Sequence, residues 1–149
     1  MRLKIISPRW PENSLWRHFI FRFPYLSITT LAALTPEGAE VTIEDENVGD
    51  IRFEDNPDLV AISIITPLAN RGYAIADRFR ERSIPVVMGG FHATWMAEEA
   101  AGHADAVVMG EAENIWPRVI EDFRKGALQK FYRADGWADL RNLPIPRRD

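Results

Sequence analysis

The sequence predicts a three-layer α/β sandwich, in which helices cover both faces of a five-stranded parallel sheet. Two observations predict this class. Short apolar runs alternate along the chain with segments of helical periodicity. The run DLVAISII, residues 58–65, is apolar on both faces, as expected of a central parallel strand covered by helices on both sides. This alternation favours the strand order 2-1-3-4-5, the flavodoxin-like (Rossmann-like) arrangement.

Each predicted strand is a short apolar run bounded by turn residues, and each predicted helix has apolar residues three and four positions apart. The predicted strands are 3–6, 41–44, 58–65, 85–88 and 104–109. The predicted helices contain the apolar stretches 26–34, 73–79, 94–101 and 112–123, and Pro24 is expected in the first turn of the first helix. Thr94 is expected to N-cap the third helix. The fourth helix has the clearest pattern, because its apolar residues form one continuous stripe.

The periodic pattern ends at Gly126. Beyond it come two prolines and mixed charges without helical or strand periodicity. We therefore expect residues 1–126 to form the α/β domain and residues 127–149 to be a linker.

Composition excludes several classes of protein. A net charge of −4 without a compensating basic face argues against nucleic-acid binding. No apolar run approaches the roughly 20 residues of a membrane span, and the N-terminus does not resemble a secretory signal, so a cytoplasmic protein is expected. The absence of cysteine excludes disulfides, thiolate metal sites, cysteine nucleophiles and protein-held iron–sulfur clusters in this chain.

The carboxyl ends of the predicted strands hold the candidate binding residues, because ligands of such sheets bind at that edge. Ser63 and Thr66 follow the central strand, although a hydroxyl there is also often bonded to nearby backbone. The pair Gly89-Gly90 permits a close approach of a ligand, or simply a tight turn. His92 is a candidate ligand contact, or a loop histidine without such a role.

Gly110 and Glu111 follow the last predicted strand. Glu111 and Glu113 complement the dipole of the helix expected to begin there, and their charge disfavours a phosphate site. The chain has no G-x-G-x-x-G or G-x-x-x-x-G-K-[ST] motif and no serine nucleophile elbow. The usual nucleotide sites and serine hydrolase chemistry are therefore disfavoured.

Together, four segments resemble the N-terminal cobalamin (vitamin B12)-binding domain of B12-dependent radical SAM proteins. They are LAALTPEGAEVTIEDEN (31–47), DLVAISIIT (58–66), IPVVMGGFHATWMAEEAAGHADAVVMGEAENIW (84–116) and LPIPRRD (143–149). The combination of GG-x-H-x-T with A-D-A-V-V-x-G-E-A-E carries most of the resemblance, which covers nearly the whole chain.

The resemblance implies that the dimethylbenzimidazole nucleotide tail of cobalamin runs beside the central strand, lined by Ser63, Ile65, Gly89 and Gly90. With the candidates above, the expected cofactor-binding residues are Ser63, Ile65, Thr66, Gly89, Gly90, His92, Gly110 and Glu111. No catalytic residue and no metal ligand is expected in this chain.

Two departures from related B12 proteins are informative. Related mutases and methionine synthases carry D-x-H-x-x-G after the first strand, whereas residues 7–16 here read SPRWPENSLW, without histidine or glycine. We therefore expect base-off cobalamin without a protein histidine on cobalt. Because the chain lacks cysteine, the [4Fe–4S] cluster and S-adenosylmethionine are expected only in a radical SAM domain of the same full-length protein.

The resemblance implies methyl transfer from methylcobalamin in the intact protein, with this chain as its cofactor-holding domain and not catalytic alone. One alternative is a flavodoxin-like regulatory or docking domain that does not bind cobalamin. Another is a flavin-binding protein, although Ser7-Pro8-Arg9-Trp10 offers few free backbone N–H groups for a phosphate.

Overall fold

Six parallel strands form a single sheet in the order β2-β1-β3-β4-β5-β6 in the computed structural model, which describes residues 1–15 and 25–147. The strands are β1 (Arg2–Ser7), β2 (Glu40–Asp45), β3 (Leu59–Ser63), β4 (Val86–Gly89), β5 (Ala106–Met109) and β6 (Phe131–Arg133). The predicted α/β class and the order 2-1-3-4-5 are confirmed for the first five strands. In the sheet, β2 lies on one side of β1, and β3 and all later strands lie on the other side, so the strand order reverses between β1 and β3.

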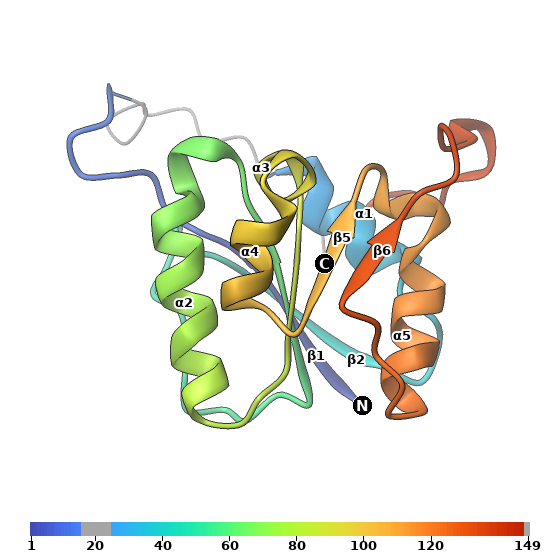
Figure 1. The fold of residues 1–149 in the computed structure, drawn as a ribbon, viewed down its shortest axis with the longest axis horizontal. Helices are drawn as coiled ribbons and strands as arrows, with labels where there is room; N and C mark the ends of the chain where they lie inside the picture. Colours follow the sequence, from blue (N-terminus) through green and yellow to red (C-terminus); the bar gives the residue numbers. More distant parts are fainter. Residues whose placement is uncertain (16–24, 148–149) are drawn as a thin grey trace.

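Helices cover both faces of the sheet (Figure 1). On one face lie α2 (Ala69–Glu81), α3 (Phe91–Trp95) and α4 (Ala97–His103). On the other face lie α1 (Leu26–Leu34) and α5 (Trp116–Arg124). Short 3-10 turns lie at Thr66–Leu68 (η2), Ala112–Asn114 (η3) and Leu140–Asn142 (η4). The apolar stretch 26–34 forms α1 and the stretch 73–79 lies within α2, whereas Pro24, expected in the first turn of the first helix, lies outside the described residues.

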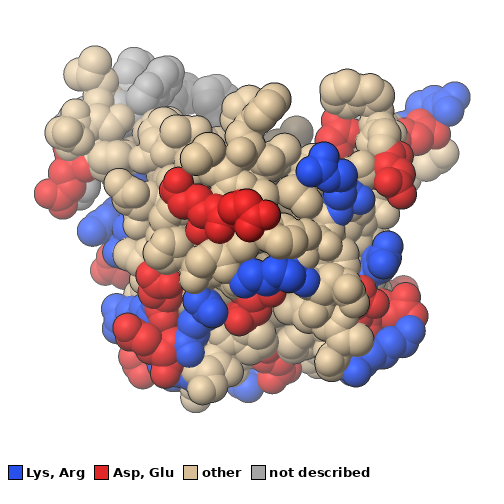
Figure 2. All heavy atoms as spheres, viewed as in Figure 1, with Lys and Arg blue, Asp and Glu red and all other residues tan. Residues whose placement is uncertain are grey.

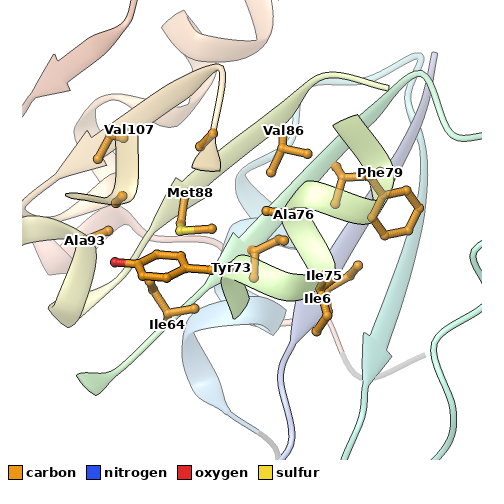
Figure 3. Packing of buried hydrophobic residues seen from close by; sticks show 14 of the residues in the cluster. Ile6, Ile64, Tyr73, Ile75, Ala76, Phe79, Val86, Met88, Ala93 and Val107 are labelled. Atoms are coloured by element: carbon orange, nitrogen blue, oxygen red, sulfur yellow. The ribbon is translucent and has the colours of Figure 1, made fainter. Parts of the chain in front are cut away.

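The face covered by α2, α3 and α4 is packed solidly. Figure 3 shows Tyr73 and Ala76 of α2 turned toward Met88 and Val86 of the sheet. Each of these four side chains is buried, as is Phe79 one turn further along the helix. This core anchors the centre of the sheet, so the loops at the carboxyl ends of β3 and β4 start from a rigid base.

The strand β6 lies in the segment that we expected to be a linker. It pairs in parallel with β5, and Tyr132 is only 3% exposed while its neighbours Phe131 and Arg133 are exposed. The Tyr132 hydroxyl donates to Asp122 of α5 at 2.9 Å and accepts from the Gln129 backbone N–H. The sheet therefore has one strand more than predicted, because one buried tyrosine in three residues leaves no periodicity to detect.

Two helix starts differ from the sequence-based expectation. Thr94 lies inside α3, and α4 begins at Ala97 without a side-chain cap, so the predicted capping role of Thr94 is wrong. The predicted helix 112–123 is divided into η3 and α5, which begins at Trp116. The break has a clear cause, because Pro117 lacks an N–H and is tolerated only in the first turn of a helix.

Charged side chains of both signs lie next to one another on the face shown in Figure 2. Several form ion pairs, among them Arg80 with Asp105 at 3.4 Å. Within the described ranges, none of the helices combines the length and apolar character needed to cross a bilayer.

Candidate functional site

A cavity of about 230 Å³ lies between the sheet and the layer formed by α1, η3 and α5. The strands β3, β4 and β5 form its floor, and the two helices with η3 form its walls. It is lined by Ser27, Thr30, Leu31, Leu34, Ala61, Ile62, Ser63, Val87, Gly89, Gly90, Val108, Gly110, Glu111, Ala112, Glu113 and Trp116. The cavity thus lies on the face of the sheet opposite to the solid core of α2.

The strands beneath the cavity leave space for it because several of their residues that face it have small side chains. Alternate residues of a strand point to the same face, so Val87 and Gly89 of β4 both lie on the cavity side. Ser63 of β3 lies beside Gly89 in the parallel register. With Ala61 two positions earlier on β3, these residues leave space that larger side chains would fill.

Polar groups gather at one end of the cavity. The carboxyl ends of the strands bring Ser63 and Glu111 to this mouth, and Ser27 lies in the first turn of α1. The hydroxyl oxygens of Ser27 and Ser63 are 3.4 Å apart. Deeper along the strands and helices, the lining residues are apolar: Leu31, Leu34, Ala61, Val87, Val108 and Trp116.

Gly89 and Gly90 are glycine for different reasons. A Cβ at Gly89 would meet only Val108, at 3.6 Å or more, which is ordinary contact. Gly90 has φ +93°, and a Cβ there would lie 2.7 Å from the carbonyl oxygen of Ile64. The fold therefore requires glycine at 90, whereas at 89 a side chain fits the protein but enters the cavity.

Thr94 joins the two glycine loops at the mouth. Its hydroxyl donates to the carbonyl oxygen of Gly90 and accepts from the backbone N–H of Gly110, both at 3.0 Å. Gly110, like Gly90, has a positive φ. One side chain of α3 thus holds the loop after β4 and the loop after β5 at a fixed separation.

The structure brings five of the eight predicted binding residues to this cavity and leaves three away from it. Ser63, Gly89, Gly90, Gly110 and Glu111 line the cavity. Ile65, Thr66 and His92 do not line it. Their assignment as binding residues stays a prediction from the sequence.

His92 is buried on the opposite face of the sheet, within a hydrogen-bonded group. Its Nδ1 lies 3.2 Å from the Thr66 hydroxyl and its Nε2 lies 3.1 Å from the Tyr73 hydroxyl. Burial and the neighbouring Glu99 carboxylate raise the pKa of Tyr73, so this hydroxyl keeps its proton. The hydrogen bond between His92 and Thr66 therefore lies inside the protein and connects α3 to the loop after β3.

Glu111 links the mouth of the cavity to the C-terminal segment. Its carboxylate accepts a hydrogen bond from the backbone N–H of Ala138 at 2.6 Å. Asn114 of η3 makes a longer bond, 3.4 Å, to the carbonyl oxygen of Trp137. Residues 137–138 are thereby held against the loop that forms one wall of the mouth.

None of the predicted residues lies on the two helices that form the walls. Thr30, Leu31 and Leu34 come from α1, and Trp116 begins α5. Trp116 is 1% exposed, and its indole Nε1–H donates to the Thr35 hydroxyl at 2.9 Å. Their apolar spacing does predict buried helix faces, but it does not say that a cavity separates those faces from the sheet.

A second group of charges lies at the carboxyl ends of β1 and β2. Arg71 of α2 donates from Nε to both carboxylate oxygens of Glu46 at 3.0 Å, and the backbone N–H of Arg9 donates at 3.1 Å. Burial alone would raise the pKa of Glu46, but these hydrogen bonds and charges outweigh burial and lower it. This group ties the loop after β1 to α2.

The described residues contain no group of three or more histidine or carboxylate side chains arranged to hold a metal ion. The described part of the loop after β1, residues 8–15, carries no histidine, and His18 lies outside the described residues. A ligand of this site therefore meets hydroxyls, carboxylates and bare backbone at the mouth, and an apolar interior.

A parallel α/β sheet with such a cavity at its carboxyl edge is typical of ligand-binding domains of the doubly wound class. A family model described as the B12 binding domain matches residues 21–120. The chain belongs to this family.

Three methyltransferases are similar to the chain. Bacteriochlorophyllide d C-8(2)-methyltransferase of Chlorobaculum tepidum is 38% identical over 109 residues, which is 72% of this chain and 24% of that protein. Bacteriochlorophyllide d C-12(1)-methyltransferase of the same organism is 31% identical over 123 residues, 81% of this chain and 27% of that protein. An uncharacterized methyltransferase of Synechocystis is 28% identical, across 100% of this chain and 30% of that protein. The chain thus spans less than a third of the length of these relatives.

Proposed function

We propose that this chain binds cobalamin with the nucleotide tail inserted into the cavity beside β3. The observation that carries the proposal is the glycine-floored, apolar-walled space between the sheet and the α1–α5 layer. Pockets for drug-sized ligands measure roughly 300–1,000 Å³. At about 230 Å³, this cavity is too small for a corrinoid and is suited to one flat arm of it.

The residues present fit that arm. A planar aromatic base gains most from apolar walls, here supplied by Leu31, Leu34 and Trp116. The ribose and phosphate of a nucleotide tail need polar surroundings, and Ser27 and Ser63 supply hydroxyls at the mouth. The bare backbone of Gly89 lets the base lie close to the sheet.

The tail in the cavity requires that its base has left cobalt, so we propose the base-off form. No described histidine is free to replace the base, because His92 is bonded to Thr66 and Tyr73 and His103 is paired with Asp77. An electron paramagnetic resonance spectrum of the Co(II) form is expected to lack nitrogen superhyperfine splitting. Such splitting would contradict base-off binding without a histidine ligand.

For the intact protein we propose a B12-dependent radical SAM methyltransferase. When bound, cobalamin supplies a methyl group carried on cobalt. The similarity to methyltransferases that are more than three times longer supports a further domain. Because this chain has no cysteine, that domain would hold the [4Fe–4S] cluster and S-adenosylmethionine. The residues of this chain bind and orient the cofactor.

A direct test is to mix the purified protein with hydroxocobalamin, desalt it and record the visible spectrum. We expect retained corrinoid absorbance at a ratio near one to one. Colourless protein would contradict the proposal and favour a docking domain without ligand. Retention of flavin absorbance in a parallel sample with FMN, without retention of corrinoid, would favour the flavodoxin-like alternative.

A further inference from the structure

The interior of the cavity has a chemical preference that follows from its walls. We propose that the site selects corrinoids whose lower base is an apolar bicycle, such as dimethylbenzimidazole, over corrinoids whose lower base is a purine. This inference rests on the proposed function and adds the class of corrinoid that the site takes. It concerns Leu31, Leu34, Val87 and Trp116, which form the deep end.

The deep end offers a ligand no hydrogen-bonding side chain among the described residues. Leu34 and Val87 have none to offer, and the only polar atom of Trp116, Nε1–H, is already bonded to Thr35. The strand backbone beneath is paired in the parallel ladder between β3, β4 and β5. A polar substituent placed here would lose its bonds to water without gaining new ones.

One hydroxyl lies closer to the mouth. Thr30 is 8% exposed, it lines the cavity one turn below Ser27, and its hydroxyl makes no hydrogen bond within the described residues. Because α1 runs away from the mouth, Leu34 lies a further turn inward. Thr30 is therefore positioned to contact the part of a base nearest its ribose. Leu34 is positioned to contact the part farthest from the ribose.

The two classes of base differ at the far part. Both are joined to the ribose through the five-membered ring, so the six-membered ring enters first and reaches deepest. In dimethylbenzimidazole that ring carries two methyl groups, whereas in adenine it carries ring nitrogens and an amine. Leaving such groups buried and unpaired lowers affinity by roughly ten- to a hundredfold.

The test compares three corrinoids on the full chain by equilibrium dialysis with absorbance detection. The probes are hydroxocobalamin, its analogue with adenine as lower base, and cobinamide, which has no nucleotide tail. We expect hydroxocobalamin to bind best and the adenine analogue to bind at least about tenfold more weakly. Equal Kd values for hydroxocobalamin and the adenine analogue would overturn the selectivity while leaving the proposed function in place.

The remaining outcomes separate the two proposals. Equal binding of cobinamide and cobalamin would overturn insertion of the tail, and with it this inference. No binding of any corrinoid would overturn the proposed function itself.

Variants of α1 test the cause of the preference. Leu34→Gln adds a deep amide that pairs with the purine, so the ratio of the two Kd values is expected to fall at least about threefold. Leu26→Gln is the matched control, because Leu26 is exposed on the same helix and does not line the cavity. Comparing this ratio of Kd values between variants cancels the intrinsic differences between the two corrinoids.

If Leu34→Gln does not fold by circular dichroism, Val87→Thr adds a hydroxyl to the floor with almost no change of shape. The same fall in the ratio is expected. An unchanged ratio in every folded variant of the deep end would overturn the inference.

Discussion

Two adjacent glycines at the end of β4 show how the same residue type serves separate purposes. At Gly90 the requirement is internal, because a positive φ and the nearby Ile64 carbonyl exclude a side chain. At Gly89 the backbone is that of an ordinary strand and the space above it belongs to the cavity. Stability and binding can therefore be separated by substitutions one position apart.

Gly89→Val is expected to abolish retention of cobalamin while changing the free energy of unfolding by less than about 1 kcal/mol, because valine suits a strand. Gly90→Ala is expected to lower the free energy of unfolding by about 2 kcal/mol or more, through backbone strain and contact with Ile64. Urea unfolding and the desalting assay measure the two effects. Normal cobalamin retention by Gly89→Val would remove Gly89 from the site.

At the scale of elements, β6 shows how a three-residue edge strand is held by backbone pairing with its neighbour β5 and by one buried side chain. Tyr132 contacts the core of α5, and its hydroxyl makes two hydrogen bonds. Lys130, just before the strand, donates to the carbonyl oxygens of Ala101 and Ala104 at the end of α4. The strand therefore ties the last helix to the rest of the sheet.

Tyr132→Ala is expected to lower the free energy of unfolding by about 3–5 kcal/mol, because it empties a buried site and removes the hydrogen bond to Asp122. Phe131→Ala, the neighbouring position on the exposed face, is expected to cost less than about 1 kcal/mol. Urea denaturation midpoints of the two variants provide the comparison. Equal midpoints would show that β6 does not pack as described.

For the whole molecule, the sheet separates a solid core from a core that contains a cavity. The group around Glu46 closes the carboxyl edge of the solid side, joining the loop after β1 to α2. Because the pKa of Glu46 is lowered in the folded state, its ionised form stabilises folding above the ordinary pKa of 4.5. That stabilisation is lost as the pH falls through the lower folded value.

Glu46→Gln is therefore expected to lower the free energy of unfolding by about 2 kcal/mol at pH 7. The difference from the unmodified protein should shrink as the pH falls below 4.5, where the unfolded carboxylate becomes protonated. Glu54→Gln is the control, because Glu54 is exposed and its ion pairs are 3.7 Å or longer. A difference that stays constant down to pH 2 would contradict this account.

Much of the fold was predictable because five of its strands are apolar runs with clear boundaries. The strand β6 was not, since a single buried tyrosine carries it. Lys4 is a second case: its strand looked apolar, yet the lysine is 1% exposed. It pairs with Glu44 at 3.0 Å and with Asp55 at 2.8 Å. Partners 40 and 51 positions away cannot be recognised from local sequence.

The candidate site was predictable in its floor and not in its walls. Strand ends share one edge of a parallel sheet, so Ser63, Gly89 and Gly110 could be grouped from the order of elements. His92 also follows a strand, but it lies in α3, which packs on the opposite face. Which face each crossover covers, and whether it fits tightly, depends on three-dimensional packing.

The low floor of the cavity has an evolutionary consequence. At Ala61 and at Gly89, a slightly larger side chain would extend into the cavity without disturbing the packing of the protein. Natural selection for folding alone would therefore not oppose such a substitution. A single nucleotide substitution at either position would then give a protein that folds normally but no longer has room for a ligand in the cavity. Small residues retained at these two positions in an orthologue would therefore indicate that ligand binding in the cavity is under selection.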